Sequence, residues 1–252
     1  MLLKKNKDLL ILITSCGKNN KKQDFQRELF KNSLLNYFFI IGGSTQSYIN
    51  KDILYLKAPD TYEMLHLKII EAIKFFKAKY NILKIDDDTL VDINKLKRFN
   101  FSFDYGGYIA NSGKGDYDYH CEKIIDKRYS SIIKSELKYK FAYGGGYYLS
   151  KKAQKIFLKN YSNSEEYYNH LKFLKGREDR LVGQTLFPYF NKLDVQNCGY
   201  RFLINKQKEH SFSAFNDSIF HPFEEKDIHS YKNSNFLKFI YYKNLLNNKK
   251  NE

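Results

Sequence analysis

Short apolar runs alternate with amphipathic segments through the first half of the chain. Five runs rich in β-branched and aromatic residues predict strands: Leu9 to Thr14, Tyr37 to Ile41, Ile53 to Leu56, Ile82 to Ile85 and Tyr105 to Ala110. Strands that alternate with helices are typical of βαβ units, which form a mostly parallel sheet. The pattern therefore predicts an α/β fold with a mostly parallel central sheet flanked by helices.

The clearest helix of this pattern is expected to begin at Asp60. The Asp60 side chain can cap the first turn, and Glu63 stands where it would complete a capping box. Apolar residues at helical spacing would then pack on the sheet: Leu65, Ile69, Ala72, Ile73 and Phe76. Two further helices are expected, one after Ser150 and one from about Glu178 to Phe190, and the polar, aromatic stretch between them reads as a loop or a short irregular helix.

The length of 252 residues predicts one domain over residues 1–235, followed by a basic, aromatic helix and a frayed tail over 236–252. The three cysteines are far apart and lack metal-ligand spacing, which argues against disulfides and a zinc site. The apolar run at Leu9 is too short to span a bilayer. These features lead us to expect a cytoplasmic protein.

The formal net charge of +15 raises the question of anionic partners. Lysine is scattered along the chain together with abundant asparagine, isoleucine and tyrosine, a pattern expected when an AT-rich genome fills solvated faces. We therefore expect no nucleic-acid partner. Peripheral contact of the basic surface with a membrane stays open.

Three consecutive aspartates, Asp86, Asp87 and Asp88, directly follow the predicted strand that ends at Ile85. In an open α/β sheet, ligands bind beyond the carboxyl ends of strands, so this aspartate triplet lies where a ligand would bind. Adjacent carboxylates repel unless a cation is present, and such oxygen ligands suit Mg²⁺ or Mn²⁺. The alternative is a solvated acidic turn.

Two later segments also carry candidate site residues. The glycine segment, Gly144, Gly145 and Gly146, interrupts a bulky aromatic stretch and would let a ligand approach the main chain, although a strand bulge would look the same. Glu178 and Asp179 stand at a predicted helix start, where acids also serve simply to complement the helix dipole.

Taken in order, five segments resemble glycosyltransferase family 31, the β-1,3-galactosyltransferase and Fringe group that includes the core-1 galactosyltransferases. The matching segments are Phe38 to Gly42, Asp60 to Tyr62 with Leu67 and Lys68, Lys84 to Asp88 with Val91, Tyr143 to Tyr147 with Leu149 and Ser150, and Glu178 and Asp179 with Val182 and Gly183. A co-linear set is more specific than any one motif.

The resemblance implies a nucleotide-sugar-binding fold of the GT-A type and a UDP-sugar donor. It also implies Mn²⁺ or Mg²⁺ as cofactor, and transfer of a hexose (galactose, N-acetylglucosamine or glucose) with inversion to a hydroxyl of a glycan or glycolipid, as a β-1,3 link. Two rivals stay open. One is a retaining glycosyltransferase of the same fold, and the other is a non-catalytic module that binds sugar or polyanions.

The resemblance also implies roles for single residues. Asp88 and His221 resemble the metal ligands, with His229 or His210 as alternatives to the latter, and Asp179 resembles the catalytic base. Six further positions that the resemblance and the segments above assign to substrate binding are Lys84, Asp86, Asp87, Gly145, Gly146 and Glu178. Arg27 joins them from a segment in which the family pattern is degraded, and Arg180 stands where the family has an apolar residue.

Overall fold

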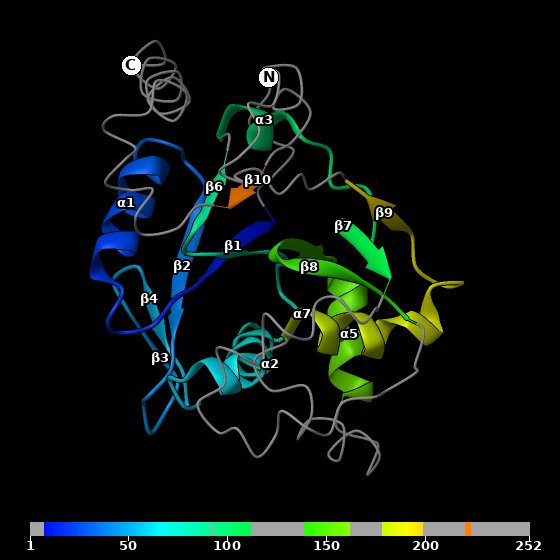
Figure 1. The fold of residues 1–252 in the computed structure, drawn as a ribbon, viewed down its shortest axis with the longest axis horizontal. Helices are drawn as coiled ribbons and strands as arrows, with labels where there is room; N and C mark the ends of the chain where they lie inside the picture. Colours follow the sequence, from blue (N-terminus) through cyan, green and yellow to red (C-terminus); the bar gives the residue numbers. More distant parts are fainter. Residues whose placement is uncertain (1–7, 92, 112–138, 162–177, 199–219, 223–252) are drawn as a thin grey trace, which may run out of the picture.

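The computed structural model describes residues 8–91, 93–111, 139–161, 178–198 and 220–222. Eight strands form one sheet in the order β3-β4-β2-β1-β5-β8-β7-β9, and β6 and β10 form a separate pair (Figure 1). The strands are β1 Leu9–Thr14, β2 Asn36–Ile41, β3 Tyr48–Asn50, β4 Ile53–Tyr55, β5 Asn81–Asp86, β6 Thr89–Val91, β7 Tyr105–Asn111, β8 Lys140–Leu149, β9 Val195–Asn197 and β10 Phe220–Pro222.

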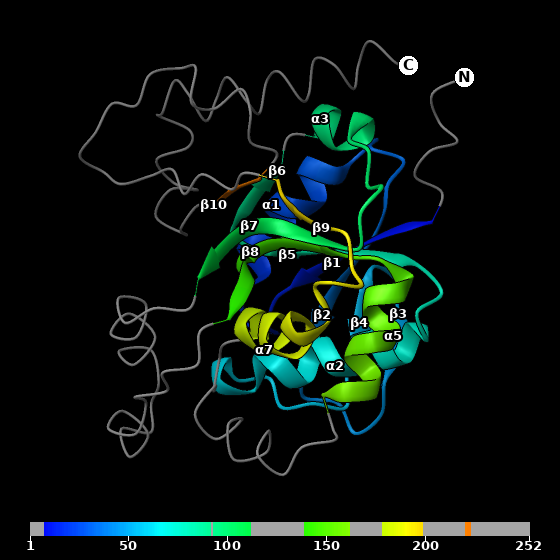
Figure 2. The ribbon, with the colours of Figure 1, turned by 90° about the vertical axis from the view of Figure 1, so that its right-hand side faces the viewer.

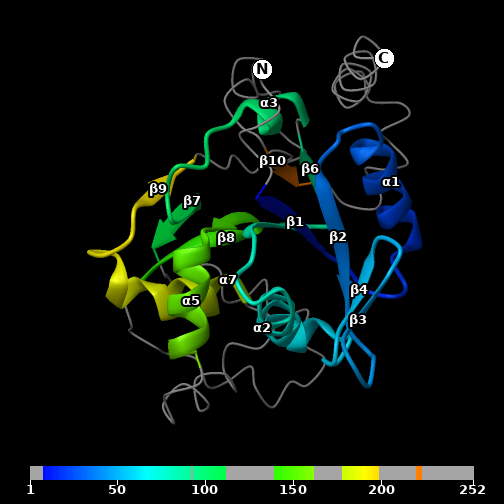
Figure 3. The same ribbon diagram turned by 180° about the vertical axis from the view of Figure 1, so that it is seen from behind.

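Helices cover both faces of the large sheet. In Figure 2, α1 and α3 lie on one side of the sheet, and α2, α5 and α7 lie on the other. Figure 3 shows the fold of Figure 1 from behind. The helices are α1 Asn20–Phe30, α2 Leu65–Phe76, α3 Ile93–Arg98, α5 Lys151–Asn160 and α7 Glu178–Leu186, with 3-10 turns η1 Tyr62–Met64 and η4 Phe187–Tyr189.

Most strands of the large sheet run in one direction. Strands β4, β2, β1 and β5 pair in parallel, and β7 pairs in parallel with β9. Strand β8 is inserted antiparallel between β5 and β7, and β3 is antiparallel at one edge. The predicted α/β class, with a mostly parallel sheet flanked by helices, is confirmed.

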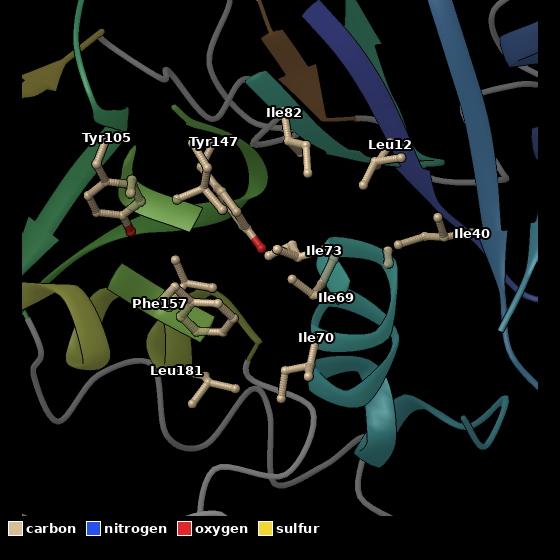
Figure 4. Close-up of a cluster of buried hydrophobic side chains, with 14 of the residues drawn as sticks. Leu12, Ile40, Ile69, Ile70, Ile73, Ile82, Tyr105, Tyr147, Phe157 and Leu181 are labelled. Atoms are coloured by element: carbon tan, nitrogen blue, oxygen red, sulfur yellow. The ribbon is translucent and has the colours of Figure 1, made fainter. Parts of the chain in front are cut away.

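The pleat of the strands divides the core into two layers. In β1, Leu10 and Leu12 pack toward α2, α5 and α7, whereas Ile11 and Ile13 pack toward α1 and α3. Figure 4 shows the first layer, where Tyr147 from β8 points toward α2. Burial on both faces explains why the parallel strands read as continuous apolar runs in the sequence.

The predicted capping box at Asp60 is wrong. A 3-10 turn precedes α2, neither has a side-chain cap, and α2 itself begins at Leu65. The Asp60 carboxylate instead accepts hydrogen bonds from the backbone N–H groups of Gly17 and Gly42 and from the ammonium of Lys68. Contacts distant in sequence have therefore replaced the local cap.

The other helix starts follow the sequence more closely. Ser150 caps α5, because its hydroxyl accepts a hydrogen bond from the N–H of Ala153. Helix α7 begins at Glu178 as expected but ends at Leu186, where a 3-10 turn containing Pro188 replaces the last predicted turn.

Several predictions lie outside the described residues. They are the C-terminal helix and tail over 236–252, the domain limit at 235, most of the polar stretch between α5 and α7, and the alternative metal ligands His210 and His229. Among the described residues, no helix combines the length and the apolar character needed to cross a membrane.

Helix α7 packs very closely on β8 at Gly183. A Cβ atom built there would lie 2.1 Å from Phe141 Cβ and 2.6 Å from Phe141 Cα. Alanine in a helix is ordinarily more stabilising than glycine by about 1 kcal/mol. We expect Gly183→Ala to lower the free energy of unfolding by about 1–3 kcal/mol instead, because α7 must move away from the strand.

Urea denaturation measures this loss. Lys155→Ala, at an exposed position of α5, is the control and is expected to change stability by no more than about 0.5 kcal/mol. A stabilised Gly183→Ala protein would contradict the packing described here.

Candidate functional site

The candidate site lies at the carboxyl ends of β1 and β5, which are neighbours in the sheet. The last residues of these strands, Thr14 and Asp86, are directly opposite each other. The strand order reverses here, because the chain continues from β1 to β2 on one side of this pair and from β5 to β7 and β8 on its other side. Such a change of direction is a topological switch point, where open α/β sheets bind ligands.

The pleat sends the acidic residues of this strand end to opposite faces of the sheet. Lys84 and Asp86 point with Ile82 toward the layer of α7, and Asp87 points with Ile85 toward the layer of α1. The aspartate triplet is therefore two half-sites that share one backbone.

The half on the α7 side is built around Lys84, whose side chain is 1% exposed. Its ammonium donates to Asp86 Oδ1 at 2.6 Å and to Glu178 Oε1 at 2.5 Å. A third bond, of 2.5 Å, goes to the carbonyl oxygen of Gly144. Three segments far apart in sequence thus meet on one nitrogen atom.

One ammonium between two carboxylates explains the pKa shifts of this group. Burial alone would lower the pKa of Lys84, but the charges of Asp86 and Glu178 raise it above its ordinary value. Burial raises the pKa of Asp86, and the charge of Glu178 adds to this effect while Lys84 opposes it. The carboxyl group of Asp86 therefore holds its proton more tightly than that of an exposed aspartate does.

The glycine segment connects the triplet to the first turn of α7. The N–H of Gly144 donates to Asp179 Oδ2 at 2.9 Å, and the carbonyl of Gly145 accepts from Thr89 Oγ1 at 2.6 Å. A Cβ atom at Gly144 would lie 3.1 Å from Glu178 Oε1. The absence of a side chain at Gly144 thus leaves room for the carboxylates of α7.

Asp179 is 7% exposed and is held by two backbone N–H groups, those of Gly144 and Arg180. Burial raises the pKa of Asp179 to about 6; the charge of Glu178 adds to this, and Arg180 opposes it. Arg180 is itself buried over the ring of Phe141, with 4.5 Å from Cζ to the ring centroid. Its packing on this ring accounts for an arginine at a position where the family pattern has an apolar residue.

The half on the α1 side holds Asp87. Its Oδ2 atom accepts hydrogen bonds from Ser15 Oγ at 2.7 Å and from Asn19 Nδ2 at 2.8 Å. Burial raises the pKa of Asp87, and the bond from Ser15, the charge of Lys22 and the bond from Asn19 counteract this. Asp87 thus fixes the loop between β1 and α1 against the end of β5.

Asp88 is the most exposed acid of the triplet, with 37% of its side chain exposed against 30% for Asp86 and 7% for Asp87. Lys22 Nζ lies 3.4 Å from Asp88 Oδ2. The backbone of β10 runs close by, since His221 pairs with Leu90 and Pro222 with Thr89. The main chain of His221 therefore reaches the strand that follows the triplet.

Mg²⁺ or Mn²⁺ typically binds through one or two carboxylates together with substrate phosphates. The accessible carboxylate of Asp88 fits such a partial ligand set. Within the described residues, no group of three or more histidine, cysteine, aspartate or glutamate side chains is arranged around a common point for a metal ion.

The structure does not bring Arg27 into this cluster. Its guanidinium donates to Asp52 Oδ2 at 2.7 Å and to Asp24 Oδ1 at 2.8 Å, and it stacks over Phe39. These contacts tie α1 to the turn between β3 and β4. The partners of Arg27 are thus structural ones, and its predicted donor contact receives no support from them.

Two lysines near the end of β1, Lys68 and Lys22, received no role from the sequence, although Lys68 lies in a segment that resembles the family. Lys68, 2% exposed, donates to the carbonyl oxygen of Ser15 at 2.9 Å and to Asp60. Burial would raise the pKa of Asp60, but Lys68 and the N–H of Gly17 lower it below its usual range. The position of Lys68 on an apolar helix face was a sign in the sequence that this lysine is buried. Nothing in the sequence distinguished Lys22 from the surface lysines.

No protein-family model matches the chain, and no curated protein matches it. Among solved structures, a glycosyltransferase involved in the glycosylation of the major capsid of PBCV-1 is similar at 13% identity and a TM-score of 0.44, over 88% of this chain and 98% of that chain. An active-site mutant of LgtC is similar at 11% identity and a TM-score of 0.46, over 85% and 86%.

The galactosyltransferase LgtC in complex with donor and acceptor sugar analogs is similar at 11% identity and a TM-score of 0.45, also over 85% and 86%. With TM-scores below 0.5, none of these likenesses carries an argument about function. The resemblance to family 31 stays a prediction.

The buried ammonium of Lys84 gives a test of the site's construction. Lys84→Met would leave Asp86 and Glu178 facing each other without a counter-charge, and removing one partner of such a buried group costs about 3–5 kcal/mol. We expect a loss of this size in urea denaturation at neutral pH.

The matched control is Lys31→Met. Lys31 is exposed and pairs with Glu28 at 3.7 Å, so its removal is expected to cost less than about 1 kcal/mol. Equal losses for the two variants would show that the Lys84 cluster contributes no more than a surface ion pair.

Proposed function

We propose that the chain is an inverting, divalent-metal-dependent glycosyltransferase of the GT-A type. It would move a hexose from a UDP-sugar to a hydroxyl of a glycan or glycolipid, making a β-1,3 link. One observation carries the proposal: the aspartate triplet and the Glu178–Asp179 pair, which the family resemblance assigns to one site, are joined through Lys84 although Lys84 and Glu178 are 94 residues apart.

The position of this assembly gives further support. It lies at the switch point of a mostly parallel sheet, where a nucleotide would be expected to bind. A carboxylate that is partly exposed, that of Asp88, adjoins carboxylates that are buried and fixed by hydrogen bonds, those of Asp87 and Glu178. The arrangement can therefore hold a charged donor on one side while keeping a base in a low-dielectric setting.

Asp179 is proposed as the base. The acceptor oxygen forms a bond to the anomeric carbon, the bond from that carbon to the diphosphate oxygen breaks on the opposite face, and the acceptor proton moves to Asp179. A base works best when its pKa lies near the working pH, and the raised pKa of Asp179, about 6, meets that condition. A positioned base of this kind contributes about 10²- to 10⁴-fold in rate.

Asp88, together with His221, would hold Mn²⁺ or Mg²⁺. When bound, the cation would stabilise the negative charge that develops on the departing diphosphate. Asp87, Asp86 and Glu178 would remain as the fixed acids around it, and Gly145 and Gly146 would offer main-chain approach to the substrates.

Two rivals make different predictions. A retaining enzyme of the same fold would give a product with the anomeric configuration of the donor, which NMR of the product determines. A non-catalytic polyanion-binding module would bind without metal, and its affinity would fall steeply with salt. Measuring UDP release from several UDP-sugars with Mn²⁺ present is the first experiment, because turnover excludes the second rival.

Replacing the proposed base gives a specific test of the mechanism. Asp179→Asn keeps the size of the side chain but cannot accept the proton, so transfer is expected to fall by about 10²-fold or more. Affinity for UDP with Mn²⁺ should stay nearly unchanged, whereas the melting temperature should fall somewhat, because the amide nitrogen of asparagine cannot accept one of the two backbone N–H bonds that hold Asp179. Glu178→Gln is the matched control and should lower transfer less than Asp179→Asn does.

The pH profile follows from the same residue. The base must be ionised, and its pKa of about 6 means that kcat/KM should rise as pH increases through about 6 and then level off. Near-normal turnover of Asp179→Asn on the true acceptor would rule out this residue as the base.

Metal dependence is tested at Asp88. Isothermal titration calorimetry should find UDP binding with Mn²⁺ but little with EDTA, and Asp88→Ala should abolish the difference, because the exposed carboxylate is lost. Asp24→Ala removes an exposed carboxylate of α1 that pairs with Arg27 and should leave UDP affinity unchanged. Equal UDP affinity with Mn²⁺ and with EDTA would contradict the metal assignment.

A further inference from the structure

Lys22 extends from the first turn of α1 to the aspartate triplet. Its Nζ atom lies 3.4 Å from Asp88 Oδ2 and 3.7 Å from Asp87 Oδ1, and its side chain is 17% exposed. Asp87 already accepts hydrogen bonds from Ser15 and Asn19. The ammonium of Lys22 is therefore the described positive charge closest to the exposed carboxylate of Asp88.

We propose that Lys22 is a resident counter-cation of the triplet, which a divalent cation must displace and which then binds the diphosphate of the donor. The proposal rests on the function proposed above. A metal ion on Asp88 and the ammonium in its present place would be like charges at close range, and they repel strongly where water is partly excluded. Metal binding to the nucleotide-free protein should therefore be weak.

Anchoring α1 does not require this ion pair. Gln26, fully buried on the same helix, donates through Nε2 to the carbonyl of Asp87 at 3.1 Å and to the carbonyl of Thr89 at 2.7 Å. The helix is thus fixed to the triplet backbone by neutral hydrogen bonds. Lys22 has a flexible stem and carries a compact charge that suits a phosphate, so it can leave Asp88 without loosening α1.

A coupling between ligands follows from this arrangement. A diphosphate draws Lys22 away from Asp88 and so makes room for the metal, in addition to ligating it. Coupling between two ligands is reciprocal, so the metal must also raise the affinity for the diphosphate. Part of this coupling depends on the charge of Lys22 alone.

Electron paramagnetic resonance of free Mn²⁺ measures metal binding without turnover. Without UDP, Lys22→Met should bind Mn²⁺ about tenfold more tightly than the wild type, an ordinary size for a coupling between sites. Lys22→Arg keeps the charge and should remain within about twofold of the wild type. Lys21→Met removes an exposed charge from the same helix turn, and its Mn²⁺ affinity should also remain within about twofold of the wild type.

The second arm repeats the titrations with UDP. The factor by which UDP tightens Mn²⁺ binding should be about tenfold smaller in Lys22→Met than in the wild type. If UDP tightens Mn²⁺ binding but Lys22→Met and Lys21→Met have equal Mn²⁺ affinity without UDP, this inference is overturned and the proposed function stands. If no protein binds Mn²⁺ with or without UDP, the proposed function is overturned, and this inference with it.

Discussion

The ammonium of Lys84 joins the end of β5, the glycine segment of β8 and the first turn of α7, and the candidate site depends on this one group. Each of its three bonds is to an oxygen atom on a different segment or side chain. Without it, the buried carboxylate of Glu178 and the partly exposed carboxylate of Asp86 would face each other without a counter-charge. The position of α7, and with it that of Asp179, follows from the same charge.

The site also depends on the antiparallel insertion of β8. A parallel strand next to β5 would have its amino end at the opposite edge of the sheet from the site. Because β8 is antiparallel, its glycine segment instead lies alongside Lys84 and Thr89. The close approach of α7 to β8 at Gly183 then sets how near the carboxylates of Glu178 and Asp179 lie to the glycine segment. Backbone geometry and one buried charge thus place the acids together.

Much of the fold could be read from the sequence, because its strands are buried on both faces. Strand β1 has the predicted limits, and Ser150 is the cap that the local pattern indicates. The acids at the end of β5 and the start of α7 could also be located. The prediction at Asp60 was wrong, because a buried ammonium and two N–H groups from other strand ends compete successfully with a local cap.

Side-chain partners were harder to predict than positions. Lys84, expected to bind substrate, is enclosed by Asp86 of its own strand and by Glu178, which is distant in sequence, and its place inside a buried apolar run was the only sign of its burial. The role of Lys22 depends on where α1 packs, which a polar, lysine-rich helix does not reveal. Arg27 pairs with Asp52 on a turn that carried no recognisable signal.

The wide spacing of the site residues along the chain has a consequence for how the protein folds. Ser15 and Asp87 are 72 residues apart, Lys84 and Gly144 are 60 apart, and Lys84 and Glu178 are 94 apart. Closing such long loops is entropically unfavourable until other contacts are in place. A chain still emerging from the ribosome can therefore pair β1, β2, β4 and β5, but it completes the acidic cluster only after α7 has been synthesised.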